Sequence, residues 1–171
     1  MGLEILNARE TPLKDDDVRF IVEIERHPKV REWLTEYVDP DPEKEFQAYK
    51  KFFRSLPRNK RVEILIARYN GGVAGFLALW RRGIYMEHVA SIGISVHPDY
   101  QGKGIAAQLV KSAIALAKAK GFKRLEIETL AENVSMRRVA ERSGFKLECV
   151  RSDRFYKDGS YRDEVCYFLS I

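Results

Sequence analysis

The sequence predicts a single α/β (α+β) domain that spans residues 1–171 and is built on one mixed sheet. Asn70-Gly71-Gly72 separates two apolar, β-branched runs, which predicts an antiparallel hairpin in the N-terminal part of the sheet. A strand, a helix and a second strand follow one another between residues 92 and 130, which predicts a parallel βαβ unit in the middle. Asp158-Gly159 separates the last two strand-like runs and predicts an antiparallel hairpin at the end.

One strand and three helical segments are predicted before the first hairpin. The strand covers residues 3–9. Asp15-Asp16-Asp17 supplies the N-cap and first-turn acids of a helix that continues to residue 25. A second helical segment covers residues 30–37. Asp41-Pro42 is a typical helix start, with an aspartate cap and a proline in the first turn, and predicts the third helix.

The remaining elements follow from alternating and helical apolar patterns. Strands are predicted over residues 62–68, 73–80, 85–96 and 123–130. Apolar side chains from Ala106 to Ala117 recur at helical spacing, and Gly121 ends that helix. Asn133 caps a shorter helix that Gly144 closes, and the chain finishes with a strand, a turn and a strand.

Composition limits the class of protein. Hydrophobic residues make up 45% and charged residues 32%, and no apolar run approaches the roughly 20 residues of a membrane span. The first residues match neither a signal peptide nor a transit peptide, so we expect a cytoplasmic protein with no membrane partner. The net charge of +5 comes from 30 basic and 25 acidic residues that are interspersed. That mixture favours a solvated surface over a nucleic-acid partner.

Cys149 and Cys166 are the two cysteines, and they lie in the two strands of the final hairpin. A turn centred on Asp158-Gly159 places Cys149 roughly opposite Phe168, so the two thiols need not face each other, and we expect two reduced thiols rather than a disulfide. The three histidines show no metal-ligand spacing with each other or with the cysteines. We therefore expect no metal site.

A glycine-bearing turn over residues 97–104 joins a predicted strand to a predicted helix. Pro98 ends the strand, Gly102 and Gly104 follow, and Ile105 begins the helix. The first N–H groups of a helix have no internal partner and lie at the positive end of its dipole. Because the two glycines have no side chain to keep an anion away, the turn is interpreted as a pyrophosphate cradle.

Two known phosphate loops fit this turn poorly. A Walker loop requires four residues between its glycines and a Ser or Thr after the lysine, and Gly102-Lys103-Gly104 has neither. The run from Gly102 to Ala107 matches the dinucleotide pattern G-x-G-x-x-A, with Glu126 as a ribose-binding acid. That pattern normally opens a mostly parallel fold, whereas here it lies in mid-chain and an antiparallel hairpin follows.

Two motifs in the chain resemble hallmarks of the GCN5-related N-acetyltransferases. The first is Gln101-Gly102-Lys103-Gly104-Ile105-Ala106 after Val96-His97-Pro98-Asp99-Tyr100, and the second is the helix from Asn133 to the pair Gly144-Phe145. The resemblance covers nearly the whole chain. Residues 27–34, 139–141 and 158–163 look most like the branch of ribosomal-protein N-terminal acetyltransferases.

The resemblance implies acetyl-CoA as the co-substrate. Its pyrophosphate would bind the turn and first helical turn, and its pantetheine arm would lie along the strand edge where residues 92–96 splay from residues 125–130. The implied cofactor-binding residues are Ile94, Ser95, Val96, Gln101, Gly102, Lys103, Gly104, Ile105, Ala106, Ala107 and Asn133. The N–H of Ile94 would polarise the thioester carbonyl. Asn133 would bond the pantetheine arm, although a helix cap alone also explains it.

The resemblance also implies a general base and a general acid. The histone-acetyltransferase branch has its base at the position of Ala90, and the ribosomal-alanine branch has it at Glu128, which is our candidate. The alternative is that Glu126 and Glu128 form an ordinary solvated strand face. Glu87 and His88 are further candidates.

The tyrosine that protonates the leaving thiolate in that branch is replaced here by Ala140. Tyr156 or Ser135 would take its place, or the thiolate leaves without a dedicated acid, which its low pKa allows.

The acceptor is expected to be a primary amine, most simply a protein N-terminal α-amine. A lysine side chain with a pKa of about 10.4 needs roughly 4 kcal/mol to lose its proton near neutral pH, whereas an α-amine needs well under 1 kcal/mol. Trp33, Tyr37 and Tyr161 lie where the family places its substrate-facing segments, although such aromatics are also common in cores and interfaces. A lysine, polyamine or other small amine, or a non-catalytic acyl-CoA-binding module, remains the alternative. The protein is expected to be a monomer or a homodimer.

Overall fold

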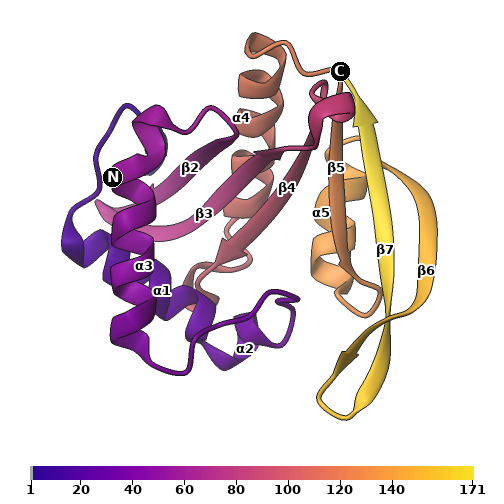
Figure 1. Ribbon diagram of the computed structural model, residues 1–171, viewed down its shortest axis with the longest axis horizontal. Helices are drawn as coiled ribbons and strands as arrows, with labels where there is room; N and C mark the ends of the chain where they lie inside the picture. Colours follow the sequence, from indigo (N-terminus) through magenta and orange to yellow (C-terminus); the bar gives the residue numbers. More distant parts are fainter. Residues whose placement is uncertain (1) are drawn as a thin grey trace.

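The computed structural model describes residues 2–171 and contains a seven-stranded sheet in the order β1-β2-β3-β4-β5-β7-β6 (Figure 1). The strands are β1 (Leu3–Asn7), β2 (Val62–Tyr69), β3 (Gly72–Arg81), β4 (Val89–Val96), β5 (Arg124–Leu130), β6 (Lys146–Lys157) and β7 (Ser160–Ser170). β4 and β5 pair in parallel, and the other neighbouring strands of the described chain pair antiparallel. The predicted α/β fold, parallel in the middle and antiparallel at both ends, is confirmed.

Helices cover both faces of the N-terminal half of the sheet. α1 (Asp15–Arg26) and α3 (Pro42–Ser55) lie on one face, and α4 (Ile105–Ala119) lies on the other, with α5 (Val134–Arg142) beside it (Figure 1). Leu77 of β3 packs in one buried cluster with Leu109 of α4, whereas Phe76 packs in a second cluster with Ile21 of α1. Because successive side chains of a strand point to opposite faces, the central strands are buried on both sides. No helix within residues 2–171 is long and apolar enough to cross a membrane.

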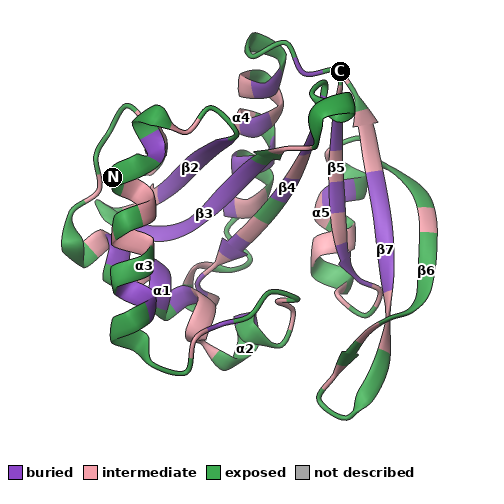
Figure 2. Ribbon diagram, in the orientation of Figure 1, coloured by how far each residue is buried: buried purple, intermediate pink, exposed green. Residues whose placement is uncertain are grey.

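The half of the sheet formed by β5, β7 and β6 differs, because a helix covers only one of its faces. Val165 and Tyr167 of β7 belong to the cluster that contains α4. The opposite face therefore carries the intervening residues, among them Glu164 and Cys166. Figure 1 shows no α-helix of the described chain in front of these three strands, and Figure 2 shows β6 as largely exposed.

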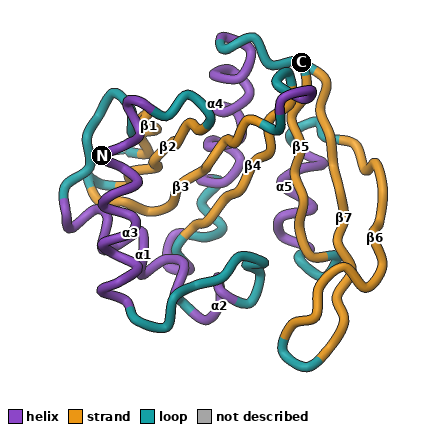
Figure 3. Tube along the Cα trace, viewed as in Figure 1, coloured by secondary structure: helices purple, strands orange, loops and turns teal. Residues whose placement is uncertain are grey.

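The predicted helical segment over residues 30–37 is wrong after its first residues. The helix α2 covers Pro28–Arg31, and residues 32–41 form turns and loops (Figure 3). The carbonyls of Arg31, Glu32 and Leu34 accept hydrogen bonds from the ammonium of Lys157 on β6. A contact from the far end of the chain thus takes carbonyls that a longer helix would use internally.

Other boundaries also differ from prediction. The first strand ends at Asn7, where the Asn7 carbonyl accepts the N–H groups of Glu10 and Thr11 in a turn. Lys14, rather than one of the aspartates, occupies the N-cap of α1, and the Asp17 carboxylate accepts its N–H at 3.0 Å.

The predicted strand over residues 85–96 begins only at Val89. Residues Ile84–Met86 form a 3-10 turn instead, in which the N–H of Met86 bonds the carbonyl of Gly83 at 2.9 Å.

The predicted register of the final hairpin is wrong at the cysteines. Cys149 pairs directly with Cys166 in the register of β6 and β7, rather than with Phe168. The register shifts between Arg151 and Phe155, where Asp153 adopts a φ of 52° and its N–H bonds the Asp163 carboxylate at 2.9 Å. This β-bulge moves the pairing by two positions, so the thiols face each other across two strands, and both remain free.

Candidate active site

A cleft opens where β4 and β5 separate. Val89–Ile92 of β4 pair with Arg124–Ile127 of β5, and beyond those pairs the two strands diverge (Figure 1). The cleft between them has a volume of about 690 Å³. Its lining comes from both strands, from the glycine turn, from α5 and from residues 29–36. The predicted splay of the parallel pair is therefore present.

The backbone of Ile94 faces this cleft. At the two ends of β4, the carbonyl of Val89 accepts from Arg82 at 3.0 Å and the N–H of His97 donates to Ala74 at 2.9 Å. Odd-numbered residues of β4 thus bond to β3, and the register with β3 has no irregularity. Because backbone groups alternate in direction along a strand, the N–H and C=O of Ile94 point away from β3, toward the side that β5 has left.

The backbones of Ser95 and Val96 follow the same alternation along β4. The backbone of Ser95 bonds to β3, although the residue lines the cleft. Val96 points its backbone to the cleft, and its carbonyl accepts from the side-chain amide of Gln101 at 3.0 Å. Gln101 thereby fixes the glycine turn to the end of β4.

The glycine turn presents an uncapped helix end to the cleft. Gly102 and Gly104 have φ values of 74° and 76°, a conformation that favours glycine. Gly104 is the N-cap of α4, and no side chain caps the first N–H groups of that helix. A Cβ added to either glycine would meet no atom within 4 Å, so the space beside them is open to a ligand. Gly102, Gly104, Ile105, Ala106 and Ala107 all line the cleft.

Lys103 points away from the cleft. Its ammonium lies 5.2 Å and 5.3 Å from the ring centroids of Tyr69 and Tyr100, and it donates to the Asp99 carbonyl at 3.1 Å. The side chain of Lys103 therefore braces the turn, whereas its neighbours contact the cleft.

Asn133 lines the cleft and caps α5 at the same time. Its side-chain oxygen accepts the N–H of Met136 at 3.1 Å, and its amide donates to the Thr129 hydroxyl at 3.2 Å. Sequence reasoning missed Arg138 and Arg142, two basic residues one helical turn apart on α5 that also line the cleft. Their spacing in the sequence was the available signal.

Glu128 reaches the cleft from β5 with two arginines bound to it. Its carboxylate lies 2.6 Å from Nη2 of Arg82 and 2.9 Å from Nη1 of Arg151. Burial acts to raise the pKa of Glu128, but the two guanidinium groups outweigh it and hold the pKa below the usual value. Glu128 is therefore a carboxylate at neutral pH.

Glu128 is one member of a continuous series of ion pairs on the uncovered face of the sheet. We call this series the ion-pair ladder. It consists of Glu148–Arg124 (2.5 Å), Arg124–Glu126 (2.8 Å), Glu126–Arg82 (3.1 Å), Arg82–Glu128 (2.6 Å), Glu128–Arg151 (2.9 Å), Arg151–Glu164 (2.7 Å) and Glu164–Arg154 (3.6 Å). Glu128 and Glu164 are the members of the ladder that line the cleft.

A possible metal cluster in the same place is already ion-paired. Glu128, Glu164 and Cys166 place ligand atoms within 4.8 Å of one another. Arg151 bonds to both carboxylates, and burial raises the pKa of the Cys166 thiol to about 12, which opposes the thiolate that metal binding requires. We therefore assign the carboxylates of Glu128 and Glu164 to the ladder.

The aromatic residues predicted to contact the acceptor separate into two groups. Trp33 lines the cleft, and so does Ser135. Tyr37 is 82% exposed and does not line it. Tyr156 and Tyr161 pair with each other near the tip of the β6–β7 hairpin, with ring centroids 5.2 Å apart, and they too lie outside the cleft lining.

The remaining positions considered for the base or the acid do not line the cleft. Ala90 and Ala140 are fully buried, and Glu87 and His88 are exposed at the start of β4.

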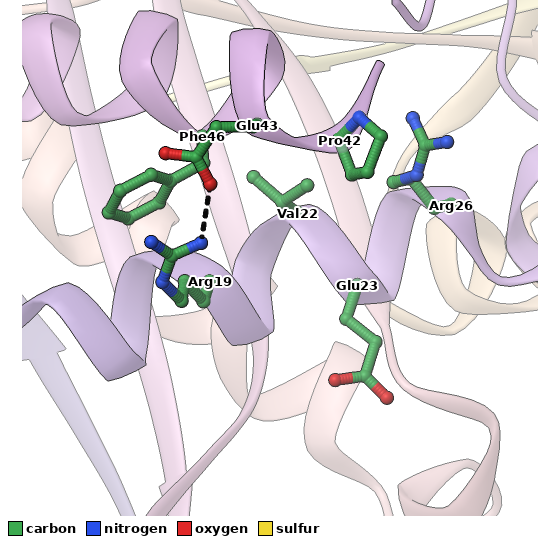
Figure 4. Close-up of a pocket in the computed structure, with 7 residues that line it drawn as sticks. All are labelled: Arg19, Val22, Glu23, Arg26, Pro42, Glu43 and Phe46. Atoms are coloured by element: carbon green, nitrogen blue, oxygen red, sulfur yellow. Dashed lines mark hydrogen bonds and ion pairs between the residues drawn. The ribbon is translucent and has the colours of Figure 1, made fainter. Parts of the chain in front are cut away.

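A smaller groove of about 340 Å³ lies between α1 and α3 (Figure 4). Arg19 pairs with Glu43 at 2.9 Å there and lies 3.7 Å above the Phe46 ring. Arg26 donates to Glu45 and to backbone carbonyls. The two arginines therefore already have partners, and these contacts hold the two helices together.

Comparison with known proteins identifies the family. The profile of the Acetyltransferase (GNAT) family matches residues 22–145. A Bacillus subtilis protein provisionally named ribosomal protein bS18-alanine N-acetyltransferase is 24% identical over 70% of this chain and 76% of its own length. The spermidine N(1)-acetyltransferase of Escherichia coli is 26% identical over 92% and 83%. A ribosomal L7/L12 α-N-protein acetyltransferase solved with coenzyme A has the same fold, with a TM-score of 0.82 and 20% identity over 100% and 95% of the two chains. The chain belongs to the GNAT acetyltransferase family and is an acyltransferase.

Proposed function

We propose that this enzyme transfers an acetyl group from acetyl-CoA to the N-terminal α-amine of a protein or peptide. The observation that carries the donor assignment is the meeting of three backbone features in one cleft. These are the splayed edge of β4, the glycine turn and the uncapped start of α4. Family membership supports acetyl transfer as the reaction.

The residues of the cleft fit acetyl-CoA. The first N–H groups of α4 suit the pyrophosphate, and Arg138 and Arg142 of α5 add positive charge to the lining of the cleft. The N–H of Ile94 is placed to stabilise negative charge on the acyl oxygen during attack. Bound acetyl-CoA would supply an activated thioester, whose acyl carbon accepts the amine nitrogen while the carbon–sulfur bond breaks.

Glu128 serves as the base in this proposal, directly or through a water molecule. Its pKa lies below the usual carboxyl range, so it is unprotonated but only weakly basic. A weak base suits an acceptor that is already partly neutral, and an α-amine with a pKa of about 7.7–8.0 is such an acceptor. The amine of a lysine or a polyamine has a higher pKa and therefore needs a stronger base.

The charge of the cleft gives a second reason to favour an α-amine. A polyamine carries several positive charges and needs unpaired carboxylates. The carboxylates of Glu128 and Glu164 are both engaged by arginines of the ladder. Glu36 is the third carboxylate of the lining, and Lys29, Arg138 and Arg142 balance its charge, so the cleft as a whole is not strongly negative.

Ser135 takes the acid role in this proposal. Its hydroxyl belongs to the cleft lining, whereas Tyr156 lies outside it. Because a thiolate is a good leaving group, this contribution is small.

The test is a matched acceptor panel followed by thiol release and mass spectrometry. One peptide has a free α-amine and no lysine, its partner has an acetylated N-terminus and one internal lysine, and the third acceptor is spermidine. We expect kcat/KM for the free α-amine to exceed both others by about 250- to 500-fold, because the pKa of an α-amine lies about 2.4–2.7 units below that of a lysine-type amine.

Two other results of this panel would contradict the proposed acceptor or the proposed activity. A preference for spermidine would assign the enzyme to the activity named in its Escherichia coli relative. Acetyl-CoA binding by calorimetry with no turnover on any amine would indicate a non-catalytic binding module.

A further inference from the structure

Lys157, at the end of β6 and near the tip of the β6–β7 hairpin, binds a segment that lines the cleft. Its ammonium donates to the carbonyls of Arg31 at 2.8 Å, Glu32 at 2.9 Å and Leu34 at 2.6 Å. An ammonium has three donors, so this one group is fully satisfied by three backbone oxygens of a segment more than 120 positions away in the sequence. We call residues 31–34 the carbonyl loop.

The carbonyl loop belongs to the wall of the cleft. Lys29, Val30, Trp33, Leu34, Thr35 and Glu36 all line the cleft beside β4. The opposite wall is formed by β5 and by Glu164 of β7. Figures 1 and 3 show that the loop after α2 and the tip of the β6–β7 hairpin lie at the same end of the molecule, where β4 and β5 have separated.

Few backbone hydrogen bonds hold the carbonyl loop, although Leu34 packs against the buried cluster that contains Ile21. α2 has four residues, so its last carbonyls have no partner within the helix. Trp33 and Leu34 hold the following turn through N–H bonds of 3.0 Å and 3.2 Å to Val30 and Arg31. Charge-assisted bonds from Lys157 are stronger than these neutral ones and direct the carbonyls of residues 31, 32 and 34 toward one point. The position of Trp33 therefore depends on an ammonium from the β6–β7 hairpin.

We propose that Lys157 is a positioning residue for the acceptor. It holds the carbonyl loop, and with it Trp33, at the spacing from β5 that lets an acceptor amine reach Glu128. The proposal rests on the proposed function for its kinetic test. It assigns Lys157 no contact with acetyl-CoA, because the glycine turn and α4 hold their geometry through Gln101 and their own backbone.

The variant Lys157→Met keeps the length of the side chain and removes the donors. We expect its KM for the peptide acceptor to rise about tenfold, with kcat and the Kd for acetyl-CoA changed less than about twofold, as loss of acceptor positioning predicts. Lys157→Arg retains the charge and hydrogen-bond donors, and we expect it to recover part of the effect. Lys146→Met, an exposed lysine at the other end of β6, is the matched control and leaves all three constants unchanged.

A second measurement does not depend on catalysis. In a Trp80→Phe background, Trp33 is the remaining tryptophan, and acrylamide quenching reports its exposure. We expect a quenching constant about twice as large in Lys157→Met as in the parent, because the loop loses its fixed position.

The outcomes separate the two proposals. Unchanged acceptor KM together with unchanged quenching overturns the role of Lys157. Equal loss of acetyl-CoA affinity overturns it as well, because the effect would then be general. If no amine is acetylated by the parent enzyme, the proposed function fails, while the quenching result still decides whether Lys157 positions Trp33.

Discussion

The two walls of the cleft are built in different ways. The donor wall consists of β4, the glycine turn and the first turn of α4, and it presents backbone groups to the ligand. What we call the acceptor wall combines the segment of residues 29–36 with β5 and β7, which lie across the cleft from it, and it depends on side chains that meet from distant parts of the chain. Lys157 reaches Leu34, and Arg82 and Arg151 reach Glu128. The donor wall should therefore be sensitive to backbone conformation, and the acceptor wall to single charged groups.

The largest effect is expected from Gly104→Val on the donor wall. A β-branched residue resists the φ of 76° at this N-cap, and its side chain enters the open space beside the first N–H groups of α4. We expect acetyl-CoA affinity, measured by calorimetry, to fall about a thousandfold, or roughly 4 kcal/mol.

Gly121→Val is the matched control. Gly121 has a φ of 79° and equally open surroundings, but it follows α4 and lies outside the cleft. Both variants should lose similar stability in urea, and the control should keep its affinity. An equal loss of affinity in the two variants would contradict a backbone-built donor wall.

On the acceptor wall, Glu128→Gln should lower kcat by about a hundredfold, in the range typical of a general base. Glu126→Gln provides the comparison, because Glu126 occupies the same strand face and the same ladder but does not line the cleft. The Kd for acetyl-CoA should stay constant in both variants. Equal activity of Glu128→Gln and the parent would remove Glu128 from the reaction.

This contrast explains how much of the molecule the sequence predicts. The splay of the parallel pair and the glycine turn follow from local signals, since proline, glycine and β-branched runs determine backbone conformation within a few residues. The cap at Asn133 can be predicted for the same reason, because a helix cap is a local feature.

The acceptor wall carries no such local signal. The helical pattern over residues 30–37 is overridden by Lys157, and a bulge at Asp153 changes which residue faces Cys149. The arginines that lower the pKa of Glu128 lie 46 and 23 positions from it. Long-range partners of this kind are set by the packing of the whole sheet, so composition and periodicity do not reveal them.

Arg82→Gln tests whether the arginines set the strength of the base. Loss of one guanidinium should raise the pKa of Glu128 toward and beyond its usual value, because burial then acts with less opposition. A base must be unprotonated, so activity is lost as the pH falls through its pKa. The kcat/KM profile falls once as the acceptor α-amine becomes protonated, near its pKa of about 7.7–8.0, and again in a more acidic limb set by Glu128; this acidic limb should move to higher pH by about one unit. An unmoved limb would mean that another group titrates there.

The smallest effect is expected at the outer end of the ion-pair ladder. Arg124 binds Glu126 and Glu148 at 2.8 Å and 2.5 Å, shorter contacts than the 3.1 Å between Arg82 and Glu126. If distance alone determined the effect, loss of Arg124 would change kcat/KM strongly. However, Glu148 is 44% exposed, and exposed ion pairs contribute only about 0–1 kcal/mol to stability. Arg124→Gln should therefore leave the acidic limb in place and change kcat/KM less than about twofold. If Arg124→Gln moved the limb as far as Arg82→Gln does, the ladder would act as one coupled unit, and the acceptor wall would extend across the whole uncovered face of the sheet.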